Sequence, residues 1–206
     1  IFSWGANWSG VNDLPQGLND VVQIAARYYY CLALKSNGLV VGWRGPAIPI
    51  GLSDVVQIAV GESHALALKK DGTVVAWGSG DGVNYGATNV PINLSNVVQV
   101  VAGRYHSVAL KGDGTVVAWG STSNGATAVP PGLTNVVYIS ESGENQTLAL
   151  KNDGTVVEWG VRTSNGNSGS IVPQSLNHVI KVVSTAYAGG LALRSDGTLV
   201  KWDSDI

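Results

Sequence analysis

The whole chain is built from one sequence pattern of about 40 residues that is written five times. The pattern reads Val-Val-Gln-Ile-Ala, then His-x-Leu-Ala-Leu-Lys, then Asp-Gly-Thr-Val-Val-Ala-Trp-Gly, then a loop that ends in Pro. A unit this short cannot bury both of its faces alone, so it needs neighbours of the same kind. We therefore expect a single repeat domain over residues 1–206, with a partial unit at 1–20 and repeats at about 21–54, 55–96, 97–135, 136–178 and 179–206.

In-phase tryptophans mark the period of this pattern. They are separated by 39, 34, 42, 40 and 43 residues. Such a period, filled with strand-like runs, is typical of propellers and other repeat arrays. The six residues are Trp4, Trp43, Trp77, Trp119, Trp159 and Trp202.

Each repeat predicts four short antiparallel strands. In the second repeat, apolar and β-branched runs at 55–59, 64–69 and 73–77 lie between turn signals, and an outer strand is expected at 87–90, before a proline. The Asp-Gly pair at 71–72 predicts a type I′ hairpin turn, because glycine tolerates positive φ. Four such strands make one propeller blade. The predicted fold class is all-β: a β-propeller of five four-stranded blades.

The second strand of each repeat predicts how the blades pack. Leu66 and Leu68 point to one face, and Ala65 and Ala67 point to the other. Because both faces are apolar, both must be covered, and we expect large residues to pack against small ones of the neighbouring blade. Cys31 stands where the other repeats have Ala, Ser, Thr or Gly, which predicts a small buried thiol.

The two ends of the chain leave the closure of the ring open. Trp4 and Trp202 both occupy the third-strand position of a repeat, so the sequence of a third strand occurs at both ends of the chain. Either residues 11–14 supply the outer strand to the last repeat and close a five-bladed ring, or the chain is an arc of a larger ring. The chain opens on Ile1 without an initiator Met, from which we expect a processed or trimmed product.

Composition argues against several functions. A net charge of −2 does not suit a nucleic-acid surface, which needs a basic stripe. No apolar run reaches 18 residues, so we expect no membrane span. One Cys and three dispersed His predict no metal site. Glu62 and Glu144 fall in equivalent loops but give no evident acid/base pair. We expect no catalytic residues, no cofactor and no enzymatic activity.

The repeats differ from one another mainly in two sets of loops, those between the first and second strands and those after the third strand. Alternating connections place both sets on one face of the disc, here called the variable face. Tyr, Trp and Arg gather there, and these residues dominate the energetics of interfaces. His64 shares its slot with His106 and also suits a structural hydrogen bond. The candidate partner-binding residues are Trp8, Arg27, Tyr28, Tyr29, His64, Tyr85, Arg104, Tyr105, Arg162 and Tyr187.

The sequence pattern of the repeat resembles that of a known family. The pattern Gly-x-x-His-(Ser/Ala)-x-Ala-Leu-Lys…Asp-Gly-Thr-Val-Val-Ala-Trp-Gly at 61–78 and 103–120 is similar to the regulator-of-chromosome-condensation repeat. The compact unit, closed by Val-Pro, is most similar to the bacterial β-lactamase-inhibitory protein II family. That family is usually seven-bladed, whereas this chain holds five repeats. The resemblance implies a propeller whose aromatic-rich loops bind a partner protein.

These observations predict a non-catalytic binding module that recognises a macromolecule through the variable face. A protein is the favoured partner, and inhibition of a secreted hydrolase is one form that such binding can take. A lectin that stacks sugar rings on the same aromatic loops is the alternative. Protein binding predicts one continuous footprint, and a lectin predicts separate pockets repeated from blade to blade. We also expect an extracellular location, and self-association if the ring is open.

Overall fold

The computed structural model describes residues 13–28, 30–78, 85–141, 144–160, 172–185 and 189–203. These residues form fifteen β-strands and one short 3-10 turn, Ser123–Gly125, so the all-β prediction is confirmed. Over the described ranges, no helix has the length and apolar content to cross a membrane. The strands are β1 (Val21–Arg27), β2 (Tyr30–Lys35), β3 (Val40–Trp43), β4 (Val55–Val60), β5 (His64–Lys69), β6 (Val74–Gly78), β7 (Val97–Ala102), β8 (His106–Lys111), β9 (Val116–Gly120), β10 (Val136–Glu141), β11 (Thr147–Lys151), β12 (Val156–Trp159), β13 (Val179–Ser184), β14 (Gly189–Arg194) and β15 (Leu199–Asp203).

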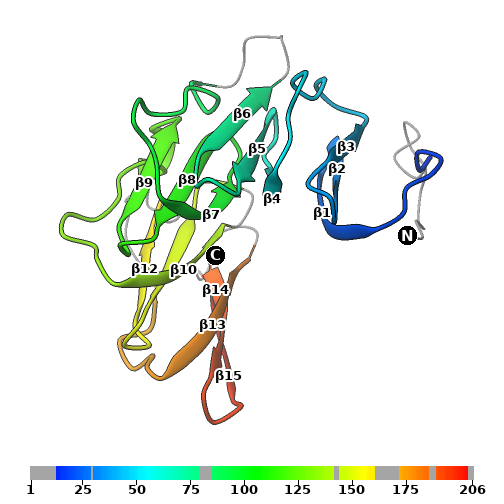
Figure 1. Ribbon diagram of the computed structural model, residues 1–206. Coiled ribbons are helices and arrows are strands. Elements are labelled where there is room, and N and C mark those ends of the chain that lie inside the picture. Colours follow the sequence, from blue (N-terminus) through cyan, green and yellow to red (C-terminus); the bar gives the residue numbers. More distant parts are fainter. Residues whose placement is uncertain are drawn as a thin grey trace.

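Each repeat forms one three-stranded antiparallel sheet, and the five sheets follow one another in chain order (Figure 1). Within the second repeat, Ile58 of β4 faces Ala67 of β5, and Ala67 faces Val75 of β6. Every sheet has the same register shift near the start of its first strand, as between Val55 and Gln57. The first strands contact one another in the order β1, β4, β7, β10 and β13, so they form the line along which the sheets are joined.

The apolar core lies between consecutive sheets. Leu66 and Leu68 of β5 pack against Val97 and Val100 of β7, together with Ala109 of the next sheet. The predicted contact of large against small side chains is thus observed. It recurs at the other boundaries: Leu32 and Leu34 cluster with Ala67, Val108 and Leu110 with Ala149, and Leu148 and Leu150 with Ala192.

A glutamine in the first strand joins each of the first three sheets to the next. The Gln57 Nε2 donates to the carbonyl of Val100 (3.0 Å), and the Gln57 Oε1 accepts from the amide of Val100 (2.9 Å). Gln23 makes the same two bonds to Ile58, and Gln99 makes them to Ile139. The amide side chain suits this role because it carries both a donor and an acceptor.

The predicted fourth strand at 87–90 is absent from the structure. Tyr85 and Gly86 have positive φ (49° and 83°), so the chain turns there instead of extending. The carbonyl of Ala87 accepts hydrogen bonds from the Trp119 Nε1 (2.8 Å) and the Ser107 Oγ (2.9 Å) of the next repeat. This segment therefore bonds the neighbouring sheet through side chains rather than through a strand ladder.

The type I′ assignment of the hairpin turns is wrong. Gly72 has positive φ (78°), but Asp71 does not, whereas a type I′ turn needs positive φ at both central residues. The Gly72 amide bonds the Lys69 carbonyl (2.9 Å), as in a type I turn followed by a left-handed glycine. Asp71 stabilises this form, because its Oδ1 accepts from the Thr73 amide (3.0 Å) and hydroxyl (2.6 Å).

The two end sheets lie apart in Figure 1, where β1–β3 is blue and β13–β15 is orange to red. Of the segment 11–14 that could close a five-bladed ring, residues 11–12 lie outside the described ranges, and residues 13–14 are not in a strand. The described sheets thus form an open array.

Candidate partner-binding surface

The variable face carries loops of successive repeats that are tied to one another through their backbones. The amide of Glu62, after β4, donates to the carbonyl of Arg104 (3.2 Å), and the amide of Arg104 donates to the carbonyl of Glu144 (2.8 Å). Gly61 starts the first of these loops, and a Cβ there would lie 2.3 Å from the His64 ring. The repeated glycine before these loops therefore lets the backbone pass close to the buried ring.

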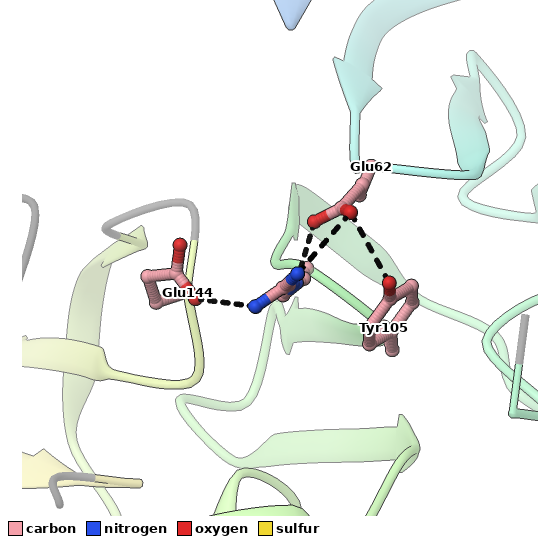
Figure 2. Close-up of polar contacts among 4 residues, drawn as sticks. Glu62, Tyr105 and Glu144 are labelled. Carbon is pink, nitrogen blue, oxygen red and sulfur yellow. Dashed lines mark hydrogen bonds and ion pairs between the residues drawn. The ribbon is translucent and has the colours of Figure 1, made fainter. Parts of the chain in front are cut away.

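Three side chains at equivalent positions of these loops form an ion-pair network (Figure 2). The Arg104 Nε lies 2.6 Å from the Glu62 Oε2, and its Nη1 lies 3.4 Å from the Glu144 Oε2. The hydrogen bond to Glu62 raises the pKa of Arg104 further above its usual range. One guanidinium between two carboxylates leaves the network with a net negative charge.

Tyr105 and Tyr85 complete this network and extend it with aromatic surface. The Tyr105 hydroxyl donates to the Glu62 Oε1 (3.1 Å), and the Arg104 guanidinium lies 5.2 Å from the centre of the Tyr105 ring (Figure 2). Partial burial, and secondly the bond to Glu62, raise the pKa of Tyr105. The exposed Tyr85 meets Tyr105 edge to face, with ring centres 4.9 Å apart. We call these five residues the Arg104 cluster: Glu62, Tyr85, Arg104, Tyr105 and Glu144.

A second pair lies on the equivalent loop of the first repeat. The Arg27 guanidinium is 5.5 Å from the centre of the Tyr28 ring, a distance at which a cation attracts an aromatic face. Tyr28 is exposed and has positive φ (48°). The remaining candidates Trp8, Tyr29, Arg162 and Tyr187 lie outside the described residues.

His64 does not belong to the exposed surface. It is fully buried, and its Nε2 lies 3.0 Å from the Ser107 Oγ of the next repeat. His106 is buried in the same way beside Thr147 (Nε2 to Oγ1, 3.4 Å). Burial lowers the pKa of His64 to about 4 and that of His106 to about 3, so both rings are neutral near pH 7. Both histidines are structural hydrogen-bonding groups.

The fourth repeat has Gln146 in the histidine slot and Glu158 where the second and third repeats have alanine. The Gln146 Nε2 donates to the Glu158 Oε1 and to the carbonyl of Gly189 (2.9 Å), and its Oε1 accepts from the Gly189 amide (3.2 Å). The two substitutions therefore occur together for a structural reason. The carboxylate of the buried Glu158 is thus engaged by the Gln146 amide.

The sequence indicated Arg104 and Tyr105 but assigned no role to Glu62 and Glu144. The available signal was the alternation of Glu, Arg and Glu at one loop position of three successive repeats. Within the ranges that the structure describes, no group of three or more His, Cys, Asp or Glu residues could hold a metal ion. Cys31 is buried as expected, and burial raises the pKa of its thiol.

Comparisons place this architecture among known proteins. A family model described as the regulator of chromosome condensation (RCC1) repeat matches residues 55–86 and 97–126. Comparison with curated protein sequences finds no match.

Several solved structures share the fold. Yeast RCC1 (Prp20), solved bound to Kap60, has a TM-score of 0.64 at 22% identity, over 89% of this chain and 56% of that chain. The ectodomain of the receptor kinase CR4 of Physcomitrella patens has a TM-score of 0.71 at 16% identity, over 92% of this chain and 52% of that chain. Human WBSCR16 has a TM-score of 0.68 at 19% identity, over 89% of this chain and 61% of that chain. This chain thus spans between half and two thirds of the length of these three proteins. The matching repeats and the shared fold show that the chain is similar to the β-propellers built from the regulator of chromosome condensation repeat.

Proposed function

We propose that this protein is a non-catalytic module that binds a protein partner through its variable face. The Arg104 cluster carries the proposal. It joins charged, hydrogen-bonding and aromatic groups from three successive repeats on one surface. A patch of this composition suits a protein interface, in which Tyr and Arg supply most of the binding energy.

The internal contacts of the cluster favour binding without a large loss of entropy. Arg104 is held by two carboxylates and by the ring of Tyr105, and Tyr105 is held in turn by Glu62. Side chains that are already ordered lose less freedom when a partner docks. The partly exposed carboxylates of Glu62 and Glu144 can also accept hydrogen bonds from a basic group of the partner.

Other observations favour a protein over a glycan. Ser63 and Asn145 stand at the position of Tyr105 in the second and fourth repeats, and Asn124 stands at the position of Tyr85 in the third, so this aromatic pair is not repeated at the neighbouring boundaries. A lectin with one sugar pocket per repeat would need such pairs in several repeats. Yeast RCC1, which has the same fold, has been solved bound to the protein Kap60.

The experiment is affinity capture from the native source with the wild-type protein and with a Tyr85→Ala/Arg104→Ala variant. Lys70→Ala, on the hairpin turns of the opposite face, is the matched control. We expect the same proteins to be captured by the wild type and the control, and the binding of the double variant to weaken by about 30-fold or more, about 2 kcal/mol.

Thermal unfolding of each variant shows whether the fold is intact. Equal capture by the folded double variant would refute the proposed face. Competition by simple sugars would show a lectin instead. The identity of the captured protein tests two further predictions, the inhibition of a secreted hydrolase and the extracellular location.

A further inference from the structure

A loop of the variable face carries an asparagine followed by a glycine, and the two residues can react with each other. Asn124 and Gly125 lie in the short 3-10 turn Ser123–Gly125, which follows β9. They stand at the position that Tyr85 and Gly86 hold in the preceding repeat. Because glycine has no side chain, its backbone nitrogen can approach the carboxamide carbon of the preceding asparagine without steric hindrance. The turn therefore contains both reacting groups of a deamidation.

The surroundings of Asn124 leave its side chain available for this reaction. Asn124 is exposed, and its side chain makes no hydrogen bond to any residue in the described ranges. Two backbone hydrogen bonds close the turn. The Gly125 amide donates to the carbonyl of Thr122 (3.1 Å), and the Ala126 amide donates to the carbonyl of Ser123 (3.0 Å). Opening of this short turn is the conformational change that the reaction needs.

The same pair of residues in the first repeat is held more firmly. The Asn37 Oδ1 accepts from the Leu39 amide (3.2 Å), and the Gly38 amide donates to the carbonyl of Lys35 (2.9 Å). Gly38 is buried, and its carbonyl accepts from the Val55 amide of the next sheet (3.2 Å). Reaction at Asn37 would therefore break a side-chain hydrogen bond as well as the backbone bonds of the hairpin.

We propose that Asn124 is a site of spontaneous deamidation, which converts it to aspartate and isoaspartate and adds a negative charge to the variable face. The Gly125 nitrogen forms a bond to the Asn124 Cγ and loses its proton to water. The bond from Cγ to the side-chain nitrogen breaks, and this nitrogen takes up a proton from water and leaves as ammonia. One water molecule then opens the five-membered succinimide at either carbonyl. Water is the only co-reactant, and nothing is oxidised or reduced.

The new carboxylate would lie close to the loop of the fourth repeat that holds Glu144. An added Cβ at Gly160 would meet both Asn145 of that loop and Ala126, next to the turn. The added charge makes the net charge −3 instead of −2. The isoaspartate product also lengthens the backbone by one carbon atom, two residues before the Ala126 carbonyl that accepts from the Trp159 Nε1 (3.1 Å).

The test is storage of the wild-type protein in a mildly alkaline buffer, because the attacking nitrogen must lose its proton. Ion-exchange chromatography follows the charge, and mass spectrometry of proteolytic peptides locates the change among Asn37, Asn124 and Asn165, the three asparagines that precede a glycine. We expect acidic forms to accumulate through conversion of Asn124. This conversion should be about fivefold or more faster than that of Asn37, where at least one further hydrogen bond must be released.

Variants separate this reaction from other sources of acidic forms. Asn124→Ser removes the carboxamide and should slow their accumulation, whereas the matched control Asn37→Ser should age like the wild type. The turn accepts residues other than asparagine, since Tyr85 has a φ of 49° where Asn124 has 53°, so Asn124→Ser is expected to fold. An Asn124→Ser variant that ages as fast as the wild type would overturn the proposal. So would an Asn124 that stays unmodified in the native protein after the denatured protein has been converted there.

Discussion

At the scale of single residues, the buried histidines connect stability to pH. His64 and His106 have pKa values lowered to about 4 and about 3, whereas an unfolded chain binds these protons near pH 6.5. Between these values the unfolded state holds more protons than the folded state. The stability that depends on the neutral rings is therefore complete above about pH 6.5 and is lost as the pH falls toward 4. The expected loss from pH 8 to pH 5 is about 2 kcal/mol per histidine.

Replacing both by glutamine, as the fourth repeat does with Gln146, should reduce this loss, since an amide does not titrate. Chemical denaturation at pH 8 and at pH 5 measures this loss of stability. His178→Asn is the matched control, because His178 is exposed and Asn96 and Asn135 hold the equivalent position. An equal loss in the double glutamine variant and in the wild type would show that other groups cause the acid sensitivity.

The burial and contacts of single side chains could be predicted only where the sequence of one repeat determines them. Cys31 and the small side chains of the second strand could be placed because alternation within a strand fixes their face. The burial of His64 depends on Ser107 of the next repeat, and the engagement of Arg104 depends on loops of both neighbouring repeats. Such contacts follow from how repeats are placed against each other, which the pattern of a single repeat does not contain.

At the scale of strands and turns, the glutamine bridges predict how firmly neighbouring sheets are joined. Gln57→Ala removes two bonds to Val100 and leaves its buried amide and carbonyl without these partners. We expect a loss of about 1–3 kcal/mol in the free energy of unfolding, measured by denaturant titration. Lys181→Ala is the control, because Lys181 occupies the same strand position in the last described sheet and is exposed there. Equal effects of the two substitutions would contradict the bridging role.

The hairpin turns give a second prediction at this scale. Gly72→Val should destabilise the protein by about 1–3 kcal/mol, because a β-branched residue is strained at a φ of 78°. The added Cβ would also lie 3.3 Å from the backbone of Asn96 in the next repeat. Lys70→Val, two residues before Gly72 and without a positive φ, is the control for β-branching itself, and thermal unfolding measures both variants. Similar stability of the two variants would refute the strain.

Strands were easier to predict than the segments that connect them. Short apolar runs between turn signals placed three strands in every repeat. The fourth was wrong because Ala87 bonds side chains of the next repeat, and the turn type was wrong because Asp-Gly fits two turn families. In both cases the deciding partner lies outside the short segment on which the prediction rested.

At the scale of the whole molecule, the repeats divide the surface into a uniform face and a variable face. The uniform face carries the same Asp-Gly-Thr turns in the last four repeats, and the variable face carries the Arg104 cluster. The sequence predicted this division, since loops that differ between repeats must meet on one side of an up-and-down array. It left the closure of the ring open, and the described sheets form an open array.

The claim that the variable face binds a protein is tested most directly by hydrogen–deuterium exchange of the protein with and without its captured partner. We expect protection of the amides at 61–63, 85–88, 103–105 and 144–146, which surround the Arg104 cluster. The hairpin turns at 70–72 and 112–114 should exchange at the same rate in both states. Protection of these turns, with the loops around Arg104 unchanged, would contradict the account.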